Sequence, residues 1–186
     1  MRIIIGLGNP DKVYEKTRHN VGFVLVDALA KSKKLDFKFS KKFNALVAED
    51  GDIFLVKPET YMNNSGLSVR AILAYYQLLP KQFGLIAKND IDLTNELIVV
   101  HDDLDIEIGK YKISLDSRSA GHRGVESIIN QLKTKNFKRI RIGIKSPLLT
   151  RMAVKDFVLK KFSAEENLVI NAIIKEIIKK ELTELV

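Results

Sequence analysis

The sequence predicts an α/β fold, in which a mixed, mostly parallel and twisted sheet carries helices on both faces. Short β-favouring apolar runs alternate along the chain with stretches of helical period, a pattern typical of sheets flanked by helices. The chain has 186 residues, of which 46% are hydrophobic and 29% are charged. These proportions suit an ordinary globular protein with one full core. We therefore expect residues 1–186 to form a single domain.

The first half of the chain alternates predicted strands with predicted helices. Residues 2–5 favour β structure and stop at a turn of glycine, asparagine and proline, which predicts a buried strand with an abrupt end. Apolar residues at helical spacing predict a helix over residues 19–31. Residues 37–49 and 53–57 are β-rich, and the acidic, glycine-containing segment between them predicts a hairpin. A polar loop then leads into a predicted helix over residues 67–79.

The second half repeats this alternation after a long link over residues 79–96. We expect this link to be an exposed excursion from the domain and not a boundary. The expected elements after it are strands over residues 97–101, 112–115 and 137–144 and a helix over residues 124–132. The segment from Ser163 to Glu166 has the pattern of a capping box, so the terminal helix should begin there. Isoleucines at helical spacing behind it should face the core.

Composition excludes several classes of protein. The chain has no cysteine, which excludes disulfides, thiolate metal sites and a cysteine nucleophile. Its start does not resemble a signal peptide, and no segment reaches the roughly 18 apolar residues of a membrane span. We therefore expect a cytoplasmic protein with no membrane partner.

The net charge of +8 is unevenly distributed. Residues 1–109 hold 14 basic and 15 acidic side chains, whereas residues 110–161 hold 14 basic and only three acidic ones. A lysine-rich composition spread over solvated faces would explain the high isoelectric point alone. Confinement of the excess to one stretch instead favours a surface that binds a polyanion such as a nucleic acid.

Polar side chains follow three of the predicted strands. Asn9 follows the first, Asn63 follows the strand over residues 53–57, and Asp102 follows the strand over residues 97–101. Ligands of open α/β sheets bind at such strand ends, and His19 starts the helix after the first strand.

These residue types suit hydrolysis by a directly attacking water molecule. An imidazole can take a proton from water near neutral pH. A carboxylate on the other ring nitrogen would fix the tautomer of the imidazole and stabilise its charged form. Carboxamides can hold the water or donate to a developing oxyanion. No serine or cysteine has the pattern of a nucleophile elbow, which argues against a covalent intermediate.

Each of these residues also has a structural interpretation. A histidine at a helix start is often structural, Asp102 could cap a turn, and Asn63 could cap the following helix. A divalent metal held by His101, Asp102 and Asp103 together with His19 is a further alternative. No histidine spacing typical of metal sites supports that alternative.

Two glycine-containing segments suggest other ligands. Residues 6–11 resemble the start of a dinucleotide fingerprint, but Asp11 stands where the third glycine is needed and Pro10 lacks the N–H that a pyrophosphate would use. Nucleotide binding is therefore not favoured. Residues 121–124 could be a simple helix-entry turn, or could present a backbone amide and Arg123 to an anion.

Five ordered blocks of the sequence resemble the bacterial peptidyl-tRNA hydrolase family. The blocks are GLGNP (6–10), Tyr14 with TRHNVG (17–22), KPETYMNNSG (57–66), HDDLD (101–105) and RIRIGI (139–144), and the similarity covers nearly the whole chain. The resemblance implies a monomeric α/β enzyme without metal or other cofactor. Such an enzyme cleaves the ester between a peptide and the 3′ ribose of tRNA, in peptidyl-tRNA lost from ribosomes. A non-catalytic RNA-binding protein on the same fold is the alternative.

The resemblance also implies roles for individual residues. It makes His19 the general base, Asp102 its partner, and Asn9 and Asn63 the groups that hold the water or the scissile carbonyl, without deciding which asparagine is the main oxyanion donor. The residues expected to bind the rest of the substrate near the ester are Tyr14, Asn20, Tyr61, Met62, His122 and Arg123. Those expected to contact the tRNA acceptor stem and 3′ CCA end are Lys112, Arg139, Arg141 and Lys145.

The sequence departs from the family pattern in two places. A glycine-rich run usually precedes the Gly-His-Asn-Gly motif, whereas residues 115–124 here have few glycines and carry Arg123 in place of the asparagine. Fewer glycines should stiffen this gate segment over the site. The link around residues 85–94 is also longer than the resemblance leads us to expect. Neither departure changes the four residues assigned to catalysis.

Overall fold

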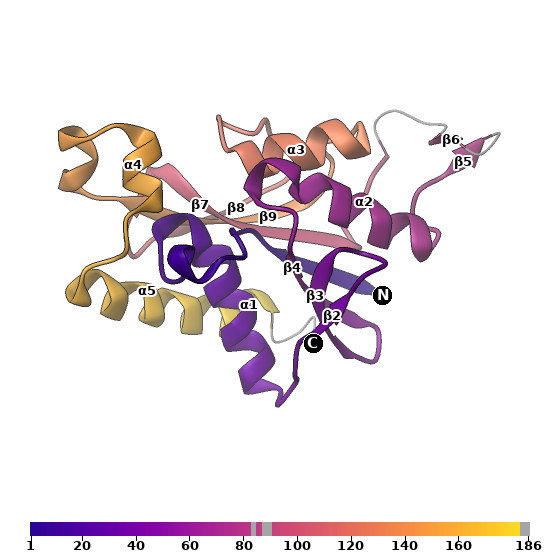
Figure 1. Cartoon of the computed structure of the whole chain (residues 1–186), viewed down its shortest axis with the longest axis horizontal. Helices are drawn as coiled ribbons and strands as arrows, with labels where there is room; N and C mark the ends of the chain where they lie inside the picture. Colours follow the sequence, from indigo (N-terminus) through magenta and orange to yellow (C-terminus); the bar gives the residue numbers. More distant parts are fainter. Residues whose placement is uncertain (83–84, 87–90, 183–186) are drawn as a thin grey trace.

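The computed structural model describes residues 1–82, 85–86 and 91–182, and in this part the main sheet has the strand order β2-β3-β4-β1-β7-β9-β8 (Figure 1). Strands β4, β1, β7 and β9 run parallel at its centre, and β3, β2 and β8 join antiparallel at the two edges. The strands are Arg2–Gly6 (β1), Lys38–Ser40 (β2), Ala45–Asp50 (β3), Ile53–Pro58 (β4), Leu97–Glu107 (β7), Tyr111–Ser114 (β8) and Lys138–Lys145 (β9). The expected fold class is confirmed.

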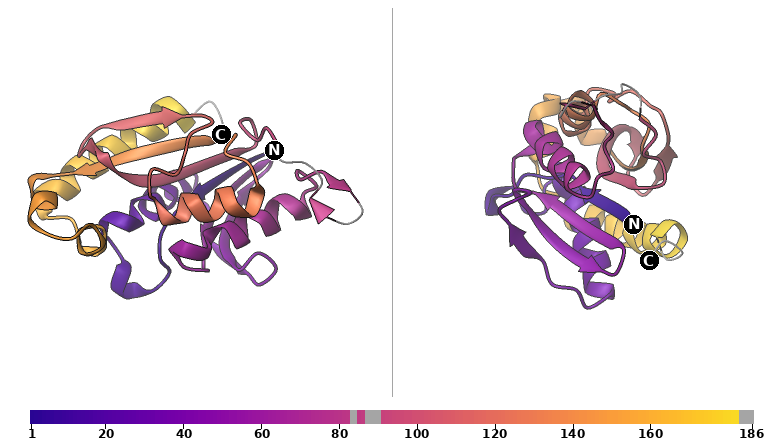
Figure 2. Two further views of the ribbon diagram at one scale, coloured as in Figure 1. Left: turned by 90° about the horizontal axis from the view of Figure 1, so that it is seen from above. Right: turned by 90° about the vertical axis from the view of Figure 1, so that its right-hand side faces the viewer.

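Helices cover both faces of this sheet, as expected (Figures 1 and 2). Helices α1, α4 and α5 pack on one face, and α2 and α3 lie side by side on the other. Successive residues of a buried strand alternate between the two cores: Ile4 and Val100 face the first layer, Ile5 and Val99 the second. The helices are Val21–Ser32 (α1), Ser65–Tyr75 (α2), Arg123–Leu132 (α3), Val154–Leu159 (α4) and Ala164–Ile177 (α5), followed by a π-helical turn over Ile178–Leu182.

Helix α1 lies unusually close to the two strands beneath it. A Cβ atom on Gly22 would come within 2.4 Å of the carbonyl oxygen of Val100 and 2.5 Å of the backbone nitrogen of Leu7. Only glycine therefore permits this approach. The contact brings the start of α1, and with it His19, against the ends of β1 and β7.

Most of the expected elements are present, with shifted boundaries. The expected helix over residues 19–31 begins at Val21, because Arg18–Asn20 form a separate 3₁₀ turn (η2). The hairpin is confirmed as the antiparallel pair of β3 and β4. At the terminal helix, Ser163 accepts from the backbone N–H of Glu166 and the Glu166 side chain accepts from that of Ser163, which confirms the capping box.

The link over residues 79–96 is not simply an exposed excursion. Leu79 and Leu93 are buried in the core, and Ile91 packs against it. Lys81–Gln82 (β5) and Leu85–Ile86 (β6) pair as a short antiparallel ladder, while residues 83–84 and 87–90 lie outside the described residues. The apolar residues anchor both ends of the link, so it belongs to the core at its base.

The sequence pattern did not predict two short elements before the terminal helix. Pro147–Arg151 form a 3₁₀ turn (η4), and Val154–Leu159 form α4. Both are too short to show a helical period, and neither has a side-chain cap at its start. Their formation depends on packing against the rest of the molecule.

Strand β7 continues past the end of its neighbour, and this difference in length creates the crevice. The ladder between β1 and β7 ends where Gly6 pairs with Val100, but β7 remains paired with β9 as far as Glu107. Asp102 therefore lies within a strand and does not follow one, which corrects the expected boundary. Beyond Val100 the β1 side of β7 is open, as ligand sites of α/β sheets require.

Candidate active site

A cleft of about 800 Å³ opens beside the ends of β1 and β7. Asn9, His19 and Asp102 are among the residues that line it. Its walls come from the 3₁₀ turns Lys12–Tyr14 (η1) and Met62–Asn64 (η3), from helix α4, and from residues 119–123 before and at the start of α3. Segments far apart in the sequence thus meet in one concave site, the usual form of a ligand pocket.

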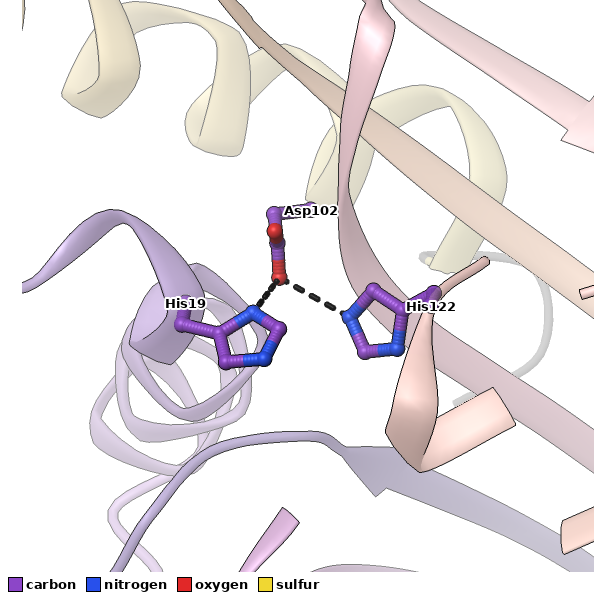
Figure 3. A group of neighbouring side chains, drawn as sticks. All are labelled: His19, Asp102 and His122. Atoms are coloured by element: carbon purple, nitrogen blue, oxygen red, sulfur yellow. Dashed lines mark hydrogen bonds and ion pairs between the residues drawn. The ribbon is translucent and has the colours of Figure 1, made fainter. Parts of the chain in front are cut away.

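Asp102 binds two histidines at the same carboxylate oxygen (Figure 3). The distance from Oδ1 is 2.8 Å to Nδ1 of His19 and 3.0 Å to Nε2 of His122. The rings of the two histidines are 4.8 Å apart. With Nδ1 of His19 donating to Asp102, Nε2 on the far side of that ring keeps its lone pair and can accept a proton (Figure 3).

The surroundings of this pair shift both pKa values. Burial lowers the pKa of His19, but the charge of Asp102 and its hydrogen bond outweigh burial, so the pKa of His19 is raised from its ordinary value. The nearby cation of Arg123 opposes this rise. Burial would raise the pKa of Asp102, yet its interaction with His19 and the hydrogen bonds from both His19 and His122 hold this pKa well below its usual range. Asp102 is therefore an anion at neutral pH.

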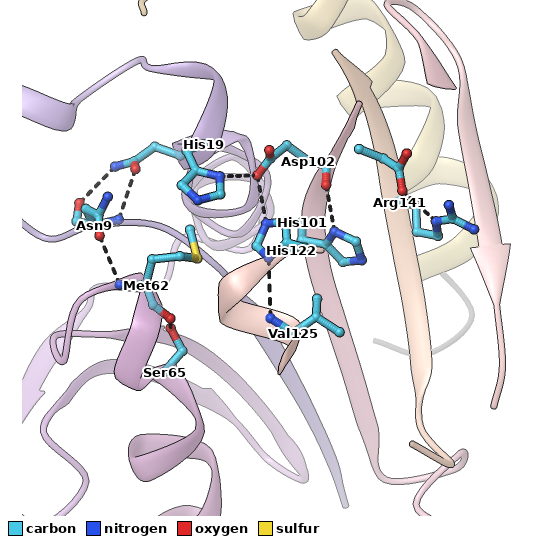
Figure 4. A network of polar contacts seen from close by, with 11 residues as sticks. Asn9, His19, Met62, Ser65, His101, Asp102, His122, Val125 and Arg141 are labelled. Carbon is cyan, nitrogen blue, oxygen red and sulfur yellow. Dashed lines mark hydrogen bonds and ion pairs between the residues drawn. The ribbon is translucent and has the colours of Figure 1, made fainter. Parts of the chain in front are cut away.

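Hydrogen bonding fixes the tautomer of His122. Its Nδ1 accepts from the backbone N–H of Val125 at 3.3 Å, which makes His122 the N-cap of α3, and its Nε2 therefore carries the proton given to Asp102 (Figure 4). In the described part of the chain, His19, Asp102 and His122 are the residues whose potential metal-binding atoms lie within 4.8 Å of one another. A cation on Nε2 of His122 would require the imidazolate while Nδ1 remains an acceptor. The hydrogen bonds suit protons and not a metal ion.

The third histidine lies behind the other two. His101 is 1% exposed, its Nδ1 donates to the backbone oxygen of Asp102 at 2.7 Å, and its ring is 4.7 Å from that of His122. Burial lowers the pKa of His101 well below its ordinary value. His101 is therefore a neutral support for the strand that carries Asp102.

Asn9 is held in place through both its backbone and its side chain. The side chain of Asn20 accepts from the backbone N–H of Asn9 and donates to its carbonyl oxygen, each at 2.9 Å. The Oδ1 of Asn9 accepts from the backbone N–H of Met62 at 2.9 Å (Figure 4). The NH₂ group of Asn9 is thus left to donate to a ligand in the cleft. Asn20, 4% exposed, contacts Asn9 and is positioned to support it.

The other expected substrate-binding residues lie at the cleft in different surroundings. Tyr14 and Asn63 line it, and Asn63 is exposed. Tyr61 is 48% exposed and donates to Asp11 at 2.6 Å, which raises the pKa of the Tyr61 hydroxyl. Arg123 is exposed in the first turn of α3 and faces the same cleft.

The four expected tRNA-binding residues are divided between surface and interior. Lys112 and Lys145 are exposed. Arg141 is paired across strands with Lys112, is partly exposed, and donates to Asp103 at 2.7 Å and to Ser114 at 3.2 Å.

Arg139 lies in the interior, where it cannot contact a phosphate directly. It is 1% exposed and donates from Nη1 to the backbone oxygen of Arg118 at 2.9 Å. Burial and the neighbouring Arg141 lower the pKa of Arg139 to about 10. The expectation that Arg139 meets tRNA from the surface is therefore corrected, because this side chain is buried and bonded to the gate segment.

Sequence reasoning missed two features of the site. The sharing of Asp102 by His19 and His122 could not be read from positions 83 and 20 residues away. The wall formed by α4, including Lys155 and Val158, had no signal because the helix itself has none. In the described part of the chain, none of the helices has the length and apolar character needed to cross a membrane.

The fold and the site define a class of protein: an α/β protein with a hydrogen-bonded histidine–aspartate pair in a cleft at the sheet edge. Comparison with known proteins narrows this class. The sequence profile described as peptidyl-tRNA hydrolase matches residues 3–185, and the chain belongs to this family.

Individual relatives agree with the family assignment. The chain is 43% identical to the peptidyl-tRNA hydrolase of Aquifex aeolicus over 182 residues, which are 96% of this chain and 87% of the relative. It is 44% identical over 170 residues to that of Mycoplasma capricolum, covering 89% and 83% of the two chains. The crystal structure of peptidyl-tRNA hydrolase from Acinetobacter baumannii is similar with a TM-score of 0.81 and 30% identity, covering 97% of this chain and 86% of the other.

Proposed function

We propose that His19 is the general base with which this chain hydrolyses peptidyl-tRNA, the reaction of its family. The bond cleaved is the ester between the peptide and the 3′ ribose of tRNA. The observation that carries the assignment is the hydrogen bond of 2.8 Å from His19 Nδ1 to Asp102, which leaves Nε2 free as a base in the cleft. The non-catalytic RNA-binding alternative gives no role to this hydrogen-bonded pair.

The reaction proceeds by attack of water on the ester carbonyl. Nε2 of His19 takes a proton from the water as its oxygen attacks the carbonyl carbon. The anion of Asp102 stabilises the imidazolium that forms, and His122, held in place by the backbone N–H of Val125, shares that anion. When the tetrahedral intermediate collapses, His19 returns the proton to the departing 3′ oxygen of the ribose.

Asn9 is the main donor to the developing oxyanion. Its carboxamide is fixed by Met62 and its backbone by Asn20, so its NH₂ group is oriented before the reaction begins. Preorganised donors of this kind stabilise charge without reorganisation. Asn63 is exposed at the rim of the cleft and holds the water or the peptide.

The remaining contacts follow the shape and charge of the molecule. Tyr14, Tyr61 and Met62 contact the peptide, and Lys112, Arg141 and Lys145 contact the acceptor stem and 3′ CCA end of the tRNA. Their charges suit phosphates. The chain acts as a single-domain monomer in the cytoplasm, where its substrate is released.

The test is hydrolysis of N-acetyl-aminoacyl-tRNA by the purified protein, compared with free aminoacyl-tRNA and repeated with a chelator. We expect cleavage of the blocked substrate in both conditions. In His19→Ala, kcat should fall by about 10²- to 10⁴-fold while tRNA binding is retained. Near-normal turnover by His19→Ala would overturn the assignment. Binding without hydrolysis by the wild-type protein would favour the RNA-binding alternative.

A further inference from the structure

Arg18, the residue immediately before His19, links three parts of the molecule from a buried position. It is 1% exposed. Its Nη1 donates to the backbone oxygens of Lys160 at 3.1 Å and Lys161 at 2.9 Å. Its Nη2 donates to both carboxylate oxygens of Glu166, at 2.8 and 2.6 Å. The guanidinium therefore joins η2 both to the end of α4 and to the start of α5.

The backbone and two aromatic rings strengthen the same junction. Thr17 and Lys161 form an isolated antiparallel bridge, and the backbone N–H of Arg18 donates to Lys160 at 3.1 Å. The guanidinium carbon lies 4.6 Å from the ring centroid of Phe157 and 5.2 Å from that of Phe162, within the range of cation–π attraction. Five groups around one side chain leave Arg18 little freedom to move.

The partners of Arg18 are suited to a cation by their place on the two helices. Lys160 is the C-cap of α4, where unpaired carbonyls give the helix end a partial negative charge. Glu166 lies in the first turn of α5 and belongs to its capping box, so its carboxylate is already held by the backbone N–H of Ser163 at 2.8 Å. Arg18 thus contacts an anchored carboxylate.

Helix α4 in turn forms one wall of the cleft. Val158 and Leu159 line the cleft from α4, and Tyr14 and Met62 line it from η1 and η3. The same short helix packs against η2, which carries His19. The position of this wall relative to the base therefore depends on the junction at Arg18.

We propose that Arg18 is a positioning residue that fixes the α4 wall of the cleft relative to His19 and so sets how the peptide part of the substrate lies against the base. The inference rests on the proposed function. A buried ion pair is by itself weak evidence of stabilisation, because apolar side chains could fill the same space. A guanidinium that donates to two backbone carbonyls and to one carboxylate fixes the relative position of the segments that carry them. Apolar packing is less directional and fixes this position less sharply.

The experiment compares two variants with a matched control. Arg18→Lys keeps the charge but loses the fork, and Glu166→Gln keeps an oxygen for the Ser163 N–H but loses the charge. For substrates with several peptide residues, kcat/KM should fall by about 10- to 100-fold, because small displacements of substrate are costly. N-acetyl-aminoacyl-tRNA should lose less, since a short acyl group makes little contact with α4. The control Ser163→Ala removes the cap of α5 and leaves Arg18 paired, so both substrates should be cleaved as by wild type.

A fluorescent reporter separates positioning from stability. The chain has no tryptophan, so Val154→Trp, at an exposed position of α4, places on the wall a single tryptophan that can be excited selectively over the tyrosines. Combining it with Arg18→Lys should lower its anisotropy at temperatures where the protein is fully folded.

Three outcomes would count against the proposal. Loss of Tm alone with unchanged kinetics, or an equal loss with long and short substrates, overturns the positioning role. Failure of the wild-type protein to cleave either substrate overturns the proposed function, and this inference with it.

Discussion

The network around Asp102 and the basic stretch over residues 110–161 meet at the same site but are organised in opposite ways. Around Asp102, side chains are buried and hydrogen bonds of 2.7 to 3.0 Å fix the direction of each imidazole. In the basic stretch, Lys112 and Lys145 are exposed, and exposed charges act over a distance and tolerate small changes in position. Chemistry here depends on geometry fixed by burial, whereas attraction of a polyanion depends mainly on charge.

Arg139 shows that the exposed charge of the basic stretch cannot be judged from the sequence alone. It belongs to the basic stretch by sequence, yet it is buried beneath the gate segment and donates to Arg118. Charge counted along a sequence therefore overstates the charge that a surface offers to a ligand.

The largest effect that would test the comparison is at Asn9. Asn9→Asp keeps an acceptor for the Met62 N–H but removes the NH₂ donor, so we expect kcat to fall by about 10²- to 10³-fold, the usual cost of one oxyanion donor. Single-turnover rates with N-acetyl-aminoacyl-tRNA measure this effect. Asn63→Asp is the matched comparison at the exposed rim and should lose less. A larger loss at Asn63 would reverse the two roles.

Charge reversal in the basic stretch should weaken binding without changing the chemical step. Lys112→Glu and Lys145→Glu should each raise KM with kcat retained, and each lost phosphate contact should flatten the log–log salt dependence of binding by about 0.7 to 0.9. Titrations of tRNA at several salt concentrations give this slope.

Two controls sharpen this prediction. Lys31→Glu, an exposed position outside the stretch, should have little effect on the slope, and so should Arg139→Gln because of its burial. Equal slopes for Lys31→Glu and Lys145→Glu would show that the uneven charge is only a matter of composition.

Two histidines of the network should affect stability in different ranges of pH. The pKa of His101 is lowered in the folded protein, so below about pH 6.5 the unfolded chain binds a proton that the folded chain does not. The free energy of unfolding therefore decreases as the pH decreases, by up to about 1.4 kcal/mol per pH unit. The folded pKa of His19 is raised, so its contribution is fully present below about pH 6.5 and is lost as pH rises through the folded pKa.

Urea unfolding as a function of pH measures both contributions. His101→Asn keeps a donor for the backbone oxygen of Asp102 and should flatten the acid side of the stability profile. His19→Asn should change the slope of the profile only above about pH 6.5, because below that pH the lost contribution is constant. An acid limb unchanged in His101→Asn would place the titrating group elsewhere.

The smallest expected effect concerns the gate segment. Ala120 has a φ of 50° and Asp116 a φ of 42°, both in the left-handed region, so the scarcity of glycine here costs backbone strain. Ala120→Gly should raise the free energy of unfolding by about 0.5 to 1 kcal/mol, because relief of strain exceeds the added entropy of the unfolded chain. Ala28→Gly within α1 should instead lower it by about 1 kcal/mol. Thermal unfolding compares the two, and destabilisation by Ala120→Gly would contradict the strain.

Local signals along the chain were enough to establish the fold class, the hairpin and the capping box at Ser163. They also singled out the site residues His19, Asp102 and Asn9. Strand and helix periods, turn residues and caps are local signals, so they can be read from neighbouring positions. The resemblance of five ordered blocks added the reaction, which composition and spacing alone left open.

Tertiary structure decided the features that depend on distant contacts. The open side of Asp102 arises because β1 ends at Gly6 while β7 continues beside β9. The second imidazole on Asp102, the burial of Arg139 and the α4 wall all follow from segments brought together by packing. A sequence shows which groups are available, but burial and hydrogen-bond direction, which set their pKa values and roles, exist only once the chain has folded.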